Sequence, residues 1–545
     1  MRGIFRAIIL FSLSGCATNR SVDASPSPAS TPIPLGSKQL LAHISVLSAD
    51  GFEGRAPGTS GERQAIDYIA SEFGKAGLSP LSRGEFSQKV PLRALSASGR
   101  FSLRSGSRAV TLDPAKDFIV QADRSLTLRS DEIVFAGYGI IAPEFGRDDY
   151  GSTDVVGKVV IVLAGEPAGF PSRKASKLGP QALDAIAESK RTYHQWFWMK
   201  QVNALKRGAK AVFILTADDR IAARRRYFQQ DYMLPETLPP WAPPLSGFLS
   251  ERIFEKGGPL DQIDLAQLRT MAVTPGFRPV ALPLHLKGEV SVESRPLLSR
   301  NVVGRIEGNG PGCVVLIAHW DGYGRDPDAA GDNIWNGAVD DAGGVAQLIE
   351  IARQLAAQGR PRRSIYFVAA TGEERGFLGS RQFLASSPCA PSEMAAAINL
   401  DWFYELGRTK RFASHGLGYS SLDETIERLI RGQGRTVTAA NAYYAGGDQL
   451  PFMLAGVPGF HGGSVSPLVG QSDGYEEAYY AKLDANAVKK EGNSNEDEVQ
   501  PQWDLRGAVE DAEIIWQLAG QIANAPAVPC WKVPSQFEDP KRICR

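Results

Sequence analysis

The longest stretch with regular hydrophobic patterning runs from Val314 to Leu384. It begins with a continuous apolar run at 314–318 that has the length of a buried strand. Residues 344–356 place apolar side chains three or four positions apart, which predicts a helix, and the apolar runs at 365–370 and 395–400 predict two more strands. Strand, helix and strand in this order predict a βαβ unit. We therefore expect an α/β fold with a mostly parallel central sheet flanked by helices.

Polar residues follow each of these predicted strands. His319 and Asp321 end the first strand, Glu373 and Glu374 follow the second, and Asp401 follows the third. The carboxyl ends of parallel strands meet at one edge of a sheet, where open α/β sheets bind ligands. Imidazole and carboxylate groups are zinc ligands, and paired glutamates suit a division between metal ligand and general base. The pattern predicts a zinc site at this edge; ordinary solvated strand ends are the competing interpretation.

Four short motifs occur in this region in a fixed order. They are AHWD (318–321), GAVDDAGG (337–344), GEERGFLGS (372–380) and NLD (399–401). On these motifs the sequence resembles the M28 family of zinc aminopeptidases. The resemblance runs from about His43 to about Gly520 and implies the α/β fold and zinc-dependent peptide hydrolysis of that family.

The resemblance also implies a role for each polar residue. The metal ligands that it implies are His319, Asp340, Glu374 and Asp401. Asp340 corresponds to a carboxylate that bridges two zinc ions, and Glu374 to a ligand of the second ion alone. Glu373 corresponds to the general base that acts on a zinc-activated water. Asp321 corresponds to a carboxylate that orients the ring of His319.

The chain departs from the family pattern near its last metal ligand. That ligand is a His four residues before an Asp-Glu pair, and alignment on Asp497 and Glu498 places Asn493 there. An amide oxygen is a poor zinc ligand compared with imidazole, so we expect the second zinc site to be weak. His461, which ends a predicted strand at 456–460, could complete the site instead. Gln449 stands where family members often carry another His.

The N-terminus combines two arginines with a short apolar run that ends in LSGC at 13–16. This run is too short to cross a bilayer and predicts an export signal at 1–16. LSGC resembles a bacterial lipoprotein cleavage box, which implies a lipid anchor on Cys16. Ala17 favours the outer membrane, facing the periplasm. An ordinary signal peptide with an incidental Cys is the alternative. The Ser- and Pro-rich residues 17–38 predict a flexible tether.

Changes in composition divide the folded part. We predict a catalytic domain in two parts, 39–105 and 286–525, with an insert at 106–285 and a C-terminal tail at 526–545. Apolar strands and long polar loops predict a β-rich insert, with one helix at 192–207. The phrases DEIVFAGYGI and DVVGKVVIVLAGEP resemble the protease-associated (PA) domain of many secreted M28 peptidases. Such a domain implies a structure that shapes access to the catalytic cleft.

Charge and cysteine content bear on the binding partners and on the disulfides of the protein. The 60 basic and 60 acidic residues give a net charge of zero, so nothing favours nucleic acid as a partner. Apart from Cys16, four cysteines remain, which permit two disulfides and three connectivities in an exported protein. Cys530 and Cys544 lie close together in the tail, and we expect them to form one bridge. Free thiols are the alternative.

The sequence as a whole predicts a metal-dependent aminopeptidase that acts on peptides with one or two zinc ions. The alternative from another class is a degenerate relative that binds peptides or a partner protein without catalysis. Asn493 and Gln449 favour that alternative, whereas the intact base and the four implied ligands oppose it. A single-zinc acyl transferase of the glutaminyl cyclase type is less favoured, because those relatives keep the His that is absent here.

Overall fold

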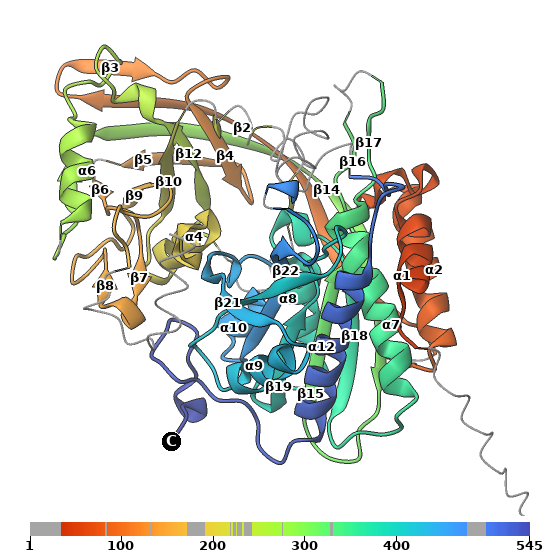
Figure 1. Ribbon diagram of the computed structural model, residues 1–545. Coiled ribbons are helices and arrows are strands. Elements are labelled where there is room, and N and C mark those ends of the chain that lie inside the picture. The colour runs from red at the N-terminus through yellow and green to blue at the C-terminus, as the bar shows by residue number, and fades with distance from the viewer. Residues whose placement is uncertain are drawn as a thin grey trace, which may run out of the picture.

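The structure, a computed structural model, contains two main β-sheets, and two long strands of the larger sheet extend to the smaller one (Figure 1). It describes residues 34–81, 84–130, 132–171, 191–217, 220–221, 225, 231–233 (backbone only), 242–274, 276–326, 331–472, 474–476 and 497–545. The larger sheet has 12 strands and the smaller has six. The predicted α/β class, with a central sheet flanked by helices, is confirmed.

The larger sheet forms the base of the candidate site. Its main path, in spatial order, is β11 (Asp231–Met233), β2 (Ser87–Ser105), β14 (His285–Ile306), β18 (Ser364–Ala370), β15 (Cys313–His319), β19 (Met394–Asn399), β22 (Gly459–Leu468), β20 (Thr409–His415) and β21 (Thr436–Ala439). The short strands β1 (Ser79–Pro80), β3 (Arg108–Thr111) and β5 (Leu126–Ser130) pair with β14 or β2.

The larger sheet is parallel only at its centre. β18, β15, β19 and β22 pair in parallel, whereas β14 pairs antiparallel with both β18 and β2, and β20 pairs antiparallel with β22. The expectation of a mostly parallel sheet is therefore correct for the centre and wrong for the flanks. β2 and β14 form a long antiparallel pair that leaves the larger sheet and reaches the second one (Figure 1).

Helices cover both faces of the parallel centre. One face packs against α1 (Ser37–Leu47), α2 (Ser60–Lys75), α7 (Gly344–Ala356), α9 (Leu422–Gly432) and α12 (Arg506–Asn524). The other packs against α8 (Leu378–Ser386) and α10 (Leu450–Leu454). Successive side chains of β15 alternate between these faces: Leu316 and Ala318 belong to the first core, Val315 and Ile317 to the second.

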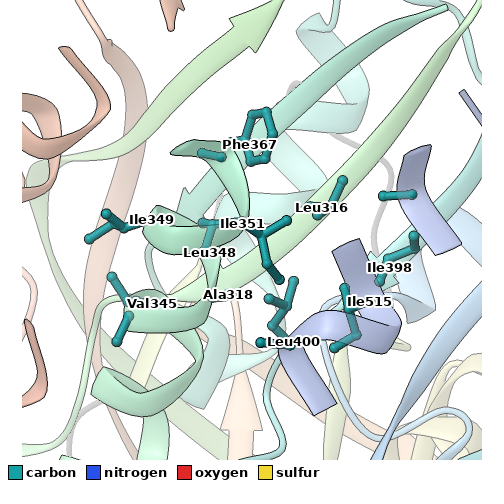
Figure 2. Close-up of a cluster of buried hydrophobic side chains, with 14 of the residues drawn as sticks. Leu316, Ala318, Val345, Leu348, Ile349, Ile351, Phe367, Ile398, Leu400 and Ile515 are labelled. Atoms are coloured by element: carbon teal, nitrogen blue, oxygen red, sulfur yellow. The ribbon is translucent and has the colours of Figure 1, made fainter. Parts of the chain in front are cut away.

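Figure 2 shows the first of these cores. Apolar side chains of β15, β18 and β19 meet those of α7 and α12 there, as Leu316, Phe367, Ile398, Leu348 and Ile515 illustrate. Each of these five side chains is at most 2% exposed. This continuous packing fixes the three parallel strands relative to each other, so the positions of their carboxyl ends are fixed as well.

The second sheet lies within the segment predicted as an insert. In spatial order its strands are β13 (Val280–Leu282), β6 (Ile133–Phe135), β9 (Val159–Leu163), β10 (Ala211–Thr216), β12 (Leu245–Ser250) and β4 (Phe118–Ala122). β6, β9, β10 and β12 are parallel, and α4 (Phe197–Lys206) and α6 (Leu265–Val273) accompany them. This part of the chain is therefore more α/β than the predicted β-rich character suggested. Its assignment to the PA type stays a prediction.

Element boundaries follow local chemistry. The helix predicted at 344–356 has those bounds as α7. The helix predicted at 192–207 starts only at Phe197, because Thr192 caps a separate 3₁₀ turn and Trp196 has an extended backbone. The strand predicted at 456–460 starts later, at Gly459, and continues to Leu468, so His461 lies inside a strand and does not end it. Within the described residues, no helix is long and apolar enough to cross a membrane.

Two disulfides are formed. Cys530 pairs with Cys544, which confirms the expected bridge in the tail, and Cys313 pairs with Cys389. Trp531 follows Cys530 directly; it is fully buried, and its Nε1 donates to the carbonyl of Gly456. The tail bridge therefore holds a short loop whose main anchor is a tryptophan packed on the catalytic domain.

Replacement of both Cys530 and Cys544 by Ser should lower the free energy of unfolding by about 3 kcal/mol, because the bridge closes a loop of 14 residues. Chemical denaturation of the oxidised protein measures this loss. Each single variant should lose as much as the double variant, since either one removes the same bond. Additive losses from the two single changes would show that the cysteines contribute through separate contacts.

Candidate active site

Three strand ends bring the predicted metal ligands together. His319 is the last residue of β15 and pairs in register with Ala370, the last residue of β18. Glu373 and Glu374 follow β18 in a 3₁₀ turn, and Asp401 follows the end of β19. The glutamate turn begins and ends at Gly372 and Gly376, whose φ angles of 68° and 103° lie in the left-handed region that favours glycine.

His319 lies at the centre of the cluster. Its Nε2 is 3.1 Å from Asp340 Oδ1, 3.8 Å from Asp401 Oδ1 and 4.0 Å from Glu373 Oε2. Among the described residues, His319, Asp340 and Asp401 form one group with the spacing that a single metal ion requires. The His319 side chain is 1% exposed, whereas those of Asp340 and Asp401 are 23% and 22% exposed. The cluster is therefore open on the carboxylate side.

The ring of His319 presents the correct nitrogen for a metal ion. Nδ1 lies 3.0 Å from the backbone carbonyl of Asp321, which accepts a hydrogen bond only from a protonated Nδ1. In the neutral ring Nε2 then carries the lone pair, and among the described residues it is buried with no hydrogen-bond partner. Such an orphaned nitrogen, facing carboxylate oxygens, fits a zinc ion.

The residue expected to orient this ring does so through a different group. The carboxylate of Asp321 is 3.7 Å from Nδ1, so the backbone carbonyl of the same residue makes the closer contact. Asp321 Oδ1 instead accepts from the backbone N–H of Glu373 at 3.2 Å. The carboxylate therefore connects the histidine strand to the glutamate turn.

Two further carboxylates fix the backbone that carries Asp340. Asp341 accepts from the backbone N–H of His319 at 3.0 Å and of Gly344 at 2.8 Å. Asp497 accepts from the N–H groups of Val339 and Asp340, at 2.7 and 3.0 Å. Neither residue belongs to the three-residue metal group. Their role is to hold the Asp340 segment against β15.

The buried guanidinium of Arg55 holds the backbone of the same segments in place. Arg55 is 1% exposed and donates to the backbone carbonyls of Trp320 and Leu47, both at 2.8 Å, and of Asn336 and Gly337, at 2.5 and 2.9 Å. Burial lowers the pKa of Arg55, and Asp497, Asp341, Asp321 and Asp340 oppose that change. Its charge therefore faces the acidic cluster although its hydrogen bonds go to neutral carbonyls.

The pKa values of the cluster report an excess of buried negative charge. Burial raises the pKa of Glu373 well above its usual range; His319 opposes the change, and Asp401 and Glu374 add to it. Burial and Asp340 raise the pKa of Glu374 in the same way. Burial lowers the pKa of His319, but the facing carboxylates of Asp340 and Asp401 outweigh it and raise that pKa well above 6.5; a metal ion would select the neutral ring, since its ligand must be deprotonated. A divalent cation would relieve this repulsion.

Glu374 lies outside the three-residue group and has a partner of its own. The phenol of Tyr323 forms a hydrogen bond with its carboxylate. Burial, with Glu374 as the next cause, raises the pKa of Tyr323 well above 10. The structure therefore places the two predicted glutamates in different surroundings: Glu373 near His319, and Glu374 against a tyrosine that sequence analysis did not identify.

The structure describes some, but not all, of the residues that were discussed for the departure from the family pattern. Gln449 is fully buried; its Oε1 accepts from Asn399, and its Nε2 donates to the carbonyl of Tyr444 at 3.0 Å. His461 Nε2 lies 2.7 Å from the backbone carbonyl of Asp401, so the expected replacement ligand binds the peptide backbone here. Asn493 lies outside the described residues.

The insert contacts the loops of the site through two tryptophans. Trp196 and Trp198 stack with ring centroids 4.6 Å apart. Their indole N–H groups donate to the carbonyls of Ala442 and Ala445, at 2.6 and 2.7 Å. Trp198 also packs edge-on against Phe377, which follows the glutamate turn. His194, in contrast, is buried, and its Nε2 lies 3.0 Å from Glu144 Oε1.

Arg55→Lys should weaken zinc binding at least tenfold, because loss of groups that orient metal ligands typically costs about 10–100-fold in affinity. The shorter set of donors should also leave a buried carbonyl unpaired and destabilise the fold by about 1–3 kcal/mol. Zinc titration of the metal-free protein and thermal denaturation measure the two effects.

Arg363→Lys is the matched control. Arg363 is another buried arginine that donates to backbone carbonyls, of Ile522 and Ala525, but it precedes β18 at the opposite end of that strand. It should lose stability and keep its zinc affinity. Equal zinc affinities of the Arg55 and Arg363 variants would show that Arg55 has only a general structural role.

Comparison with known proteins agrees with this geometry. One relative, described as "Probable zinc metalloprotease" from Pyrenophora tritici-repentis, is 29% identical over 247 residues, which are 39% of this chain and 53% of that protein. The aminopeptidase NAALADL1 of Mus musculus is 37% identical over 137 residues, which are 23% of this chain and 17% of that protein. This chain thus spans about half, or less, of the length of these relatives.

Among solved structures, an aminopeptidase from Aneurinibacillus sp. strain AM-1 is 17% identical, with a TM-score of 0.46, and covers 91% of this chain and 95% of its own. The sequence pattern of peptidase family M28 matches residues 301–496, the segment that contains His319, Asp340, Glu373, Glu374 and Asp401. Residues 301–496 of the chain are therefore similar to peptidase family M28.

Proposed function

We propose that the protein is a metal-dependent aminopeptidase that removes N-terminal residues from peptides. The observation that supports this most strongly is the convergence of His319 Nε2 with Asp340 and Asp401, and with Glu373 Oε2 at 4.0 Å from the same nitrogen. The site thus combines a metal-binding group with a separate carboxylate that can move a proton. The excess of carboxylates also suits the positively charged amino group at the start of a peptide.

Zinc is the metal that we propose, held by His319, Asp340 and Asp401. When bound, a zinc ion supplies positive charge for a developing oxyanion and lowers the pKa of water towards about 7. The neutral tautomer of His319, with its lone pair on Nε2, fits that metal. Three relatives are described as probable zinc metalloproteases, which supports the same choice.

Glu373 is the proposed general base. Its Oε2 lies 4.0 Å from His319 Nε2, where it can take a proton from the attacking water and return it to the leaving amine. The hydrogen bond from its backbone N–H to Asp321 fixes the turn that carries it. Glu373 therefore has a defined position beside the metal-binding group, which a protein that merely binds peptides would not need. This favours the enzyme over the non-catalytic alternative.

The insert is proposed to be a PA-type domain that shapes access to the site. The contacts of Trp196 and Trp198 with the segment 442–445 and with Phe377 support this, since they place the insert beside two loops of the site. We also propose that the protein is exported and lipid-anchored at Cys16, at the outer membrane facing the periplasm. The LSGC box and the Ser- and Pro-rich tether after it support this proposal.

Glu373→Gln should retain zinc and the fold but lower kcat by about 10²–10⁴-fold, the usual contribution of general acid–base catalysis. The measurement is turnover of a panel of aminoacyl substrates, with zinc content determined on the same samples. Removal of zinc by a chelator should abolish turnover, and added zinc should restore it. If the zinc-loaded wild-type protein cleaves no member of the panel, the non-catalytic alternative is favoured.

Cys16→Ser should move the protein from the membrane fraction to the soluble fraction of the cell envelope, because it removes the proposed acylation site. Immunodetection of the two fractions tests this, with Cys313→Ser as a control that leaves the proposed box intact. An unchanged membrane association of the Cys16 variant would contradict the anchor.

A further inference from the structure

Tyr323 lies beside the metal cluster in a position that sequence analysis did not assign. It follows Asp321 by two residues and precedes the short strand β16 (Gly324–Arg325). Its side chain is partly exposed, and its hydroxyl forms a hydrogen bond with the carboxylate of Glu374. The residue is therefore partly exposed although its hydroxyl belongs to the acidic cluster.

Two neighbours hold the ring of Tyr323. The ring of Trp335 lies with its centroid 5.0 Å away at an angle of 55°. The guanidinium of Arg375, the residue after Glu374, lies 4.7 Å from the centre of the tyrosine ring. A cation at this distance over an aromatic face attracts it. The ring is thus fixed, while its O–H can still rotate about the C–O bond.

The hydroxyl lies beside Glu374, outside the three-residue metal group. Within the part of the chain that the structure describes, the group suited to one ion contains His319, Asp340 and Asp401 but not Glu374. The charge of Asp340 acts on both Tyr323 and Glu374, so the phenol lies near two carboxylates that a second ion would use. A second ion in such a site stabilises negative charge on the substrate oxygen. A hydroxyl hydrogen can do the same.

We propose that Tyr323 is a catalytic residue whose hydroxyl donates a hydrogen bond to the carbonyl oxygen of the scissile bond as negative charge develops there. The proposal rests on the aminopeptidase function proposed above. Before substrate binds, the hydroxyl points to Glu374, and rotation about the C–O bond redirects the hydrogen without movement of the ring. No covalent bond to Tyr323 forms, and its proton stays on the phenol. A fixed donor of this kind needs no reorganisation at the moment of reaction.

Tyr323→Phe tests this proposal, since it removes only the hydroxyl. Loss of one oxyanion donor typically lowers kcat by about 10²–10³-fold. We expect a fall of that size, with KM changed less than about threefold and with zinc content per chain unchanged. A kcat equal to that of the wild type overturns the proposal. So does a changed zinc content, because Tyr323 would then be a metal ligand or a group that excludes a second ion.

Tyr68→Phe is the matched control. Tyr68 is also partly exposed, and its hydroxyl lies 2.7 Å from Nδ1 of His43, on α2 and away from the cluster. It should lose a comparable hydrogen bond and keep its kcat. A similar fall in kcat in both variants would assign the effect of Tyr323 to general destabilisation and overturn the proposal.

A binding measurement separates this proposal from the proposed function. An aminoalkyl boronic acid forms a tetrahedral adduct that imitates the oxyanion, whereas the corresponding free amino acid does not. In zinc-loaded protein, Tyr323→Phe should weaken the boronic acid by about 10²-fold and leave the amino acid unchanged. If no substrate is cleaved but this difference is found, the aminopeptidase function fails and the donor role of Tyr323 stands. Equal loss for both ligands, or no loss for either, contradicts the donor role.

Discussion

Buried negative charge at the carboxyl ends of β15, β18 and β19 is the constraint on which the rest of the structure depends. Burial raises the pKa of Asp321, Asp341, Glu373 and Glu374, because a carboxylate away from water is costly unless a cation is near. The buried imidazole of His319 and the buried guanidinium of Arg55 oppose this excess of negative charge. The orphaned Nε2 of His319 identifies the place at which a metal ion would complete the charge balance.

The backbone around the site is arranged to keep these charges apart and in place. Within the described residues, Asp341 and Asp497 accept backbone N–H bonds around the Asp340 segment, and Arg55 donates to backbone carbonyls. Charged groups thus fix neutral peptide groups, and the carboxylates that face the open side remain available to bind a ligand. The end of α1, the start of α7 and the C-terminal part of the chain all take part, so the site depends on contacts between segments that are distant in the sequence.

The insert and the tail both pack against loops around the site. The long pair β2 and β14 leaves the larger sheet and supports the second one, so the insert has a rigid base. Its tryptophan stack then reaches back to the loops that follow β18 and precede α10. The tail packs into the same hydrophobic cluster as these tryptophans through Trp531, and one disulfide closes it. Both additions stiffen loops that carry no regular hydrogen-bonding pattern of their own.

The sequence by itself determined the α/β class, helix α7, the tail disulfide and the set of candidate residues at three strand ends. These follow from apolar runs, helical periodicity and motif order, which are local properties of the chain. Only the tertiary structure decided the antiparallel flanks, the backbone contacts of Asp321 and His461, and the roles of Arg55, Asp497 and Tyr323. Arg55 lies 265 residues from Trp320, to which it donates, and Asp497 lies 157 residues from Asp340. Such pairs leave no periodic signal, because burial and hydrogen-bond geometry select them only after the distant segments have packed.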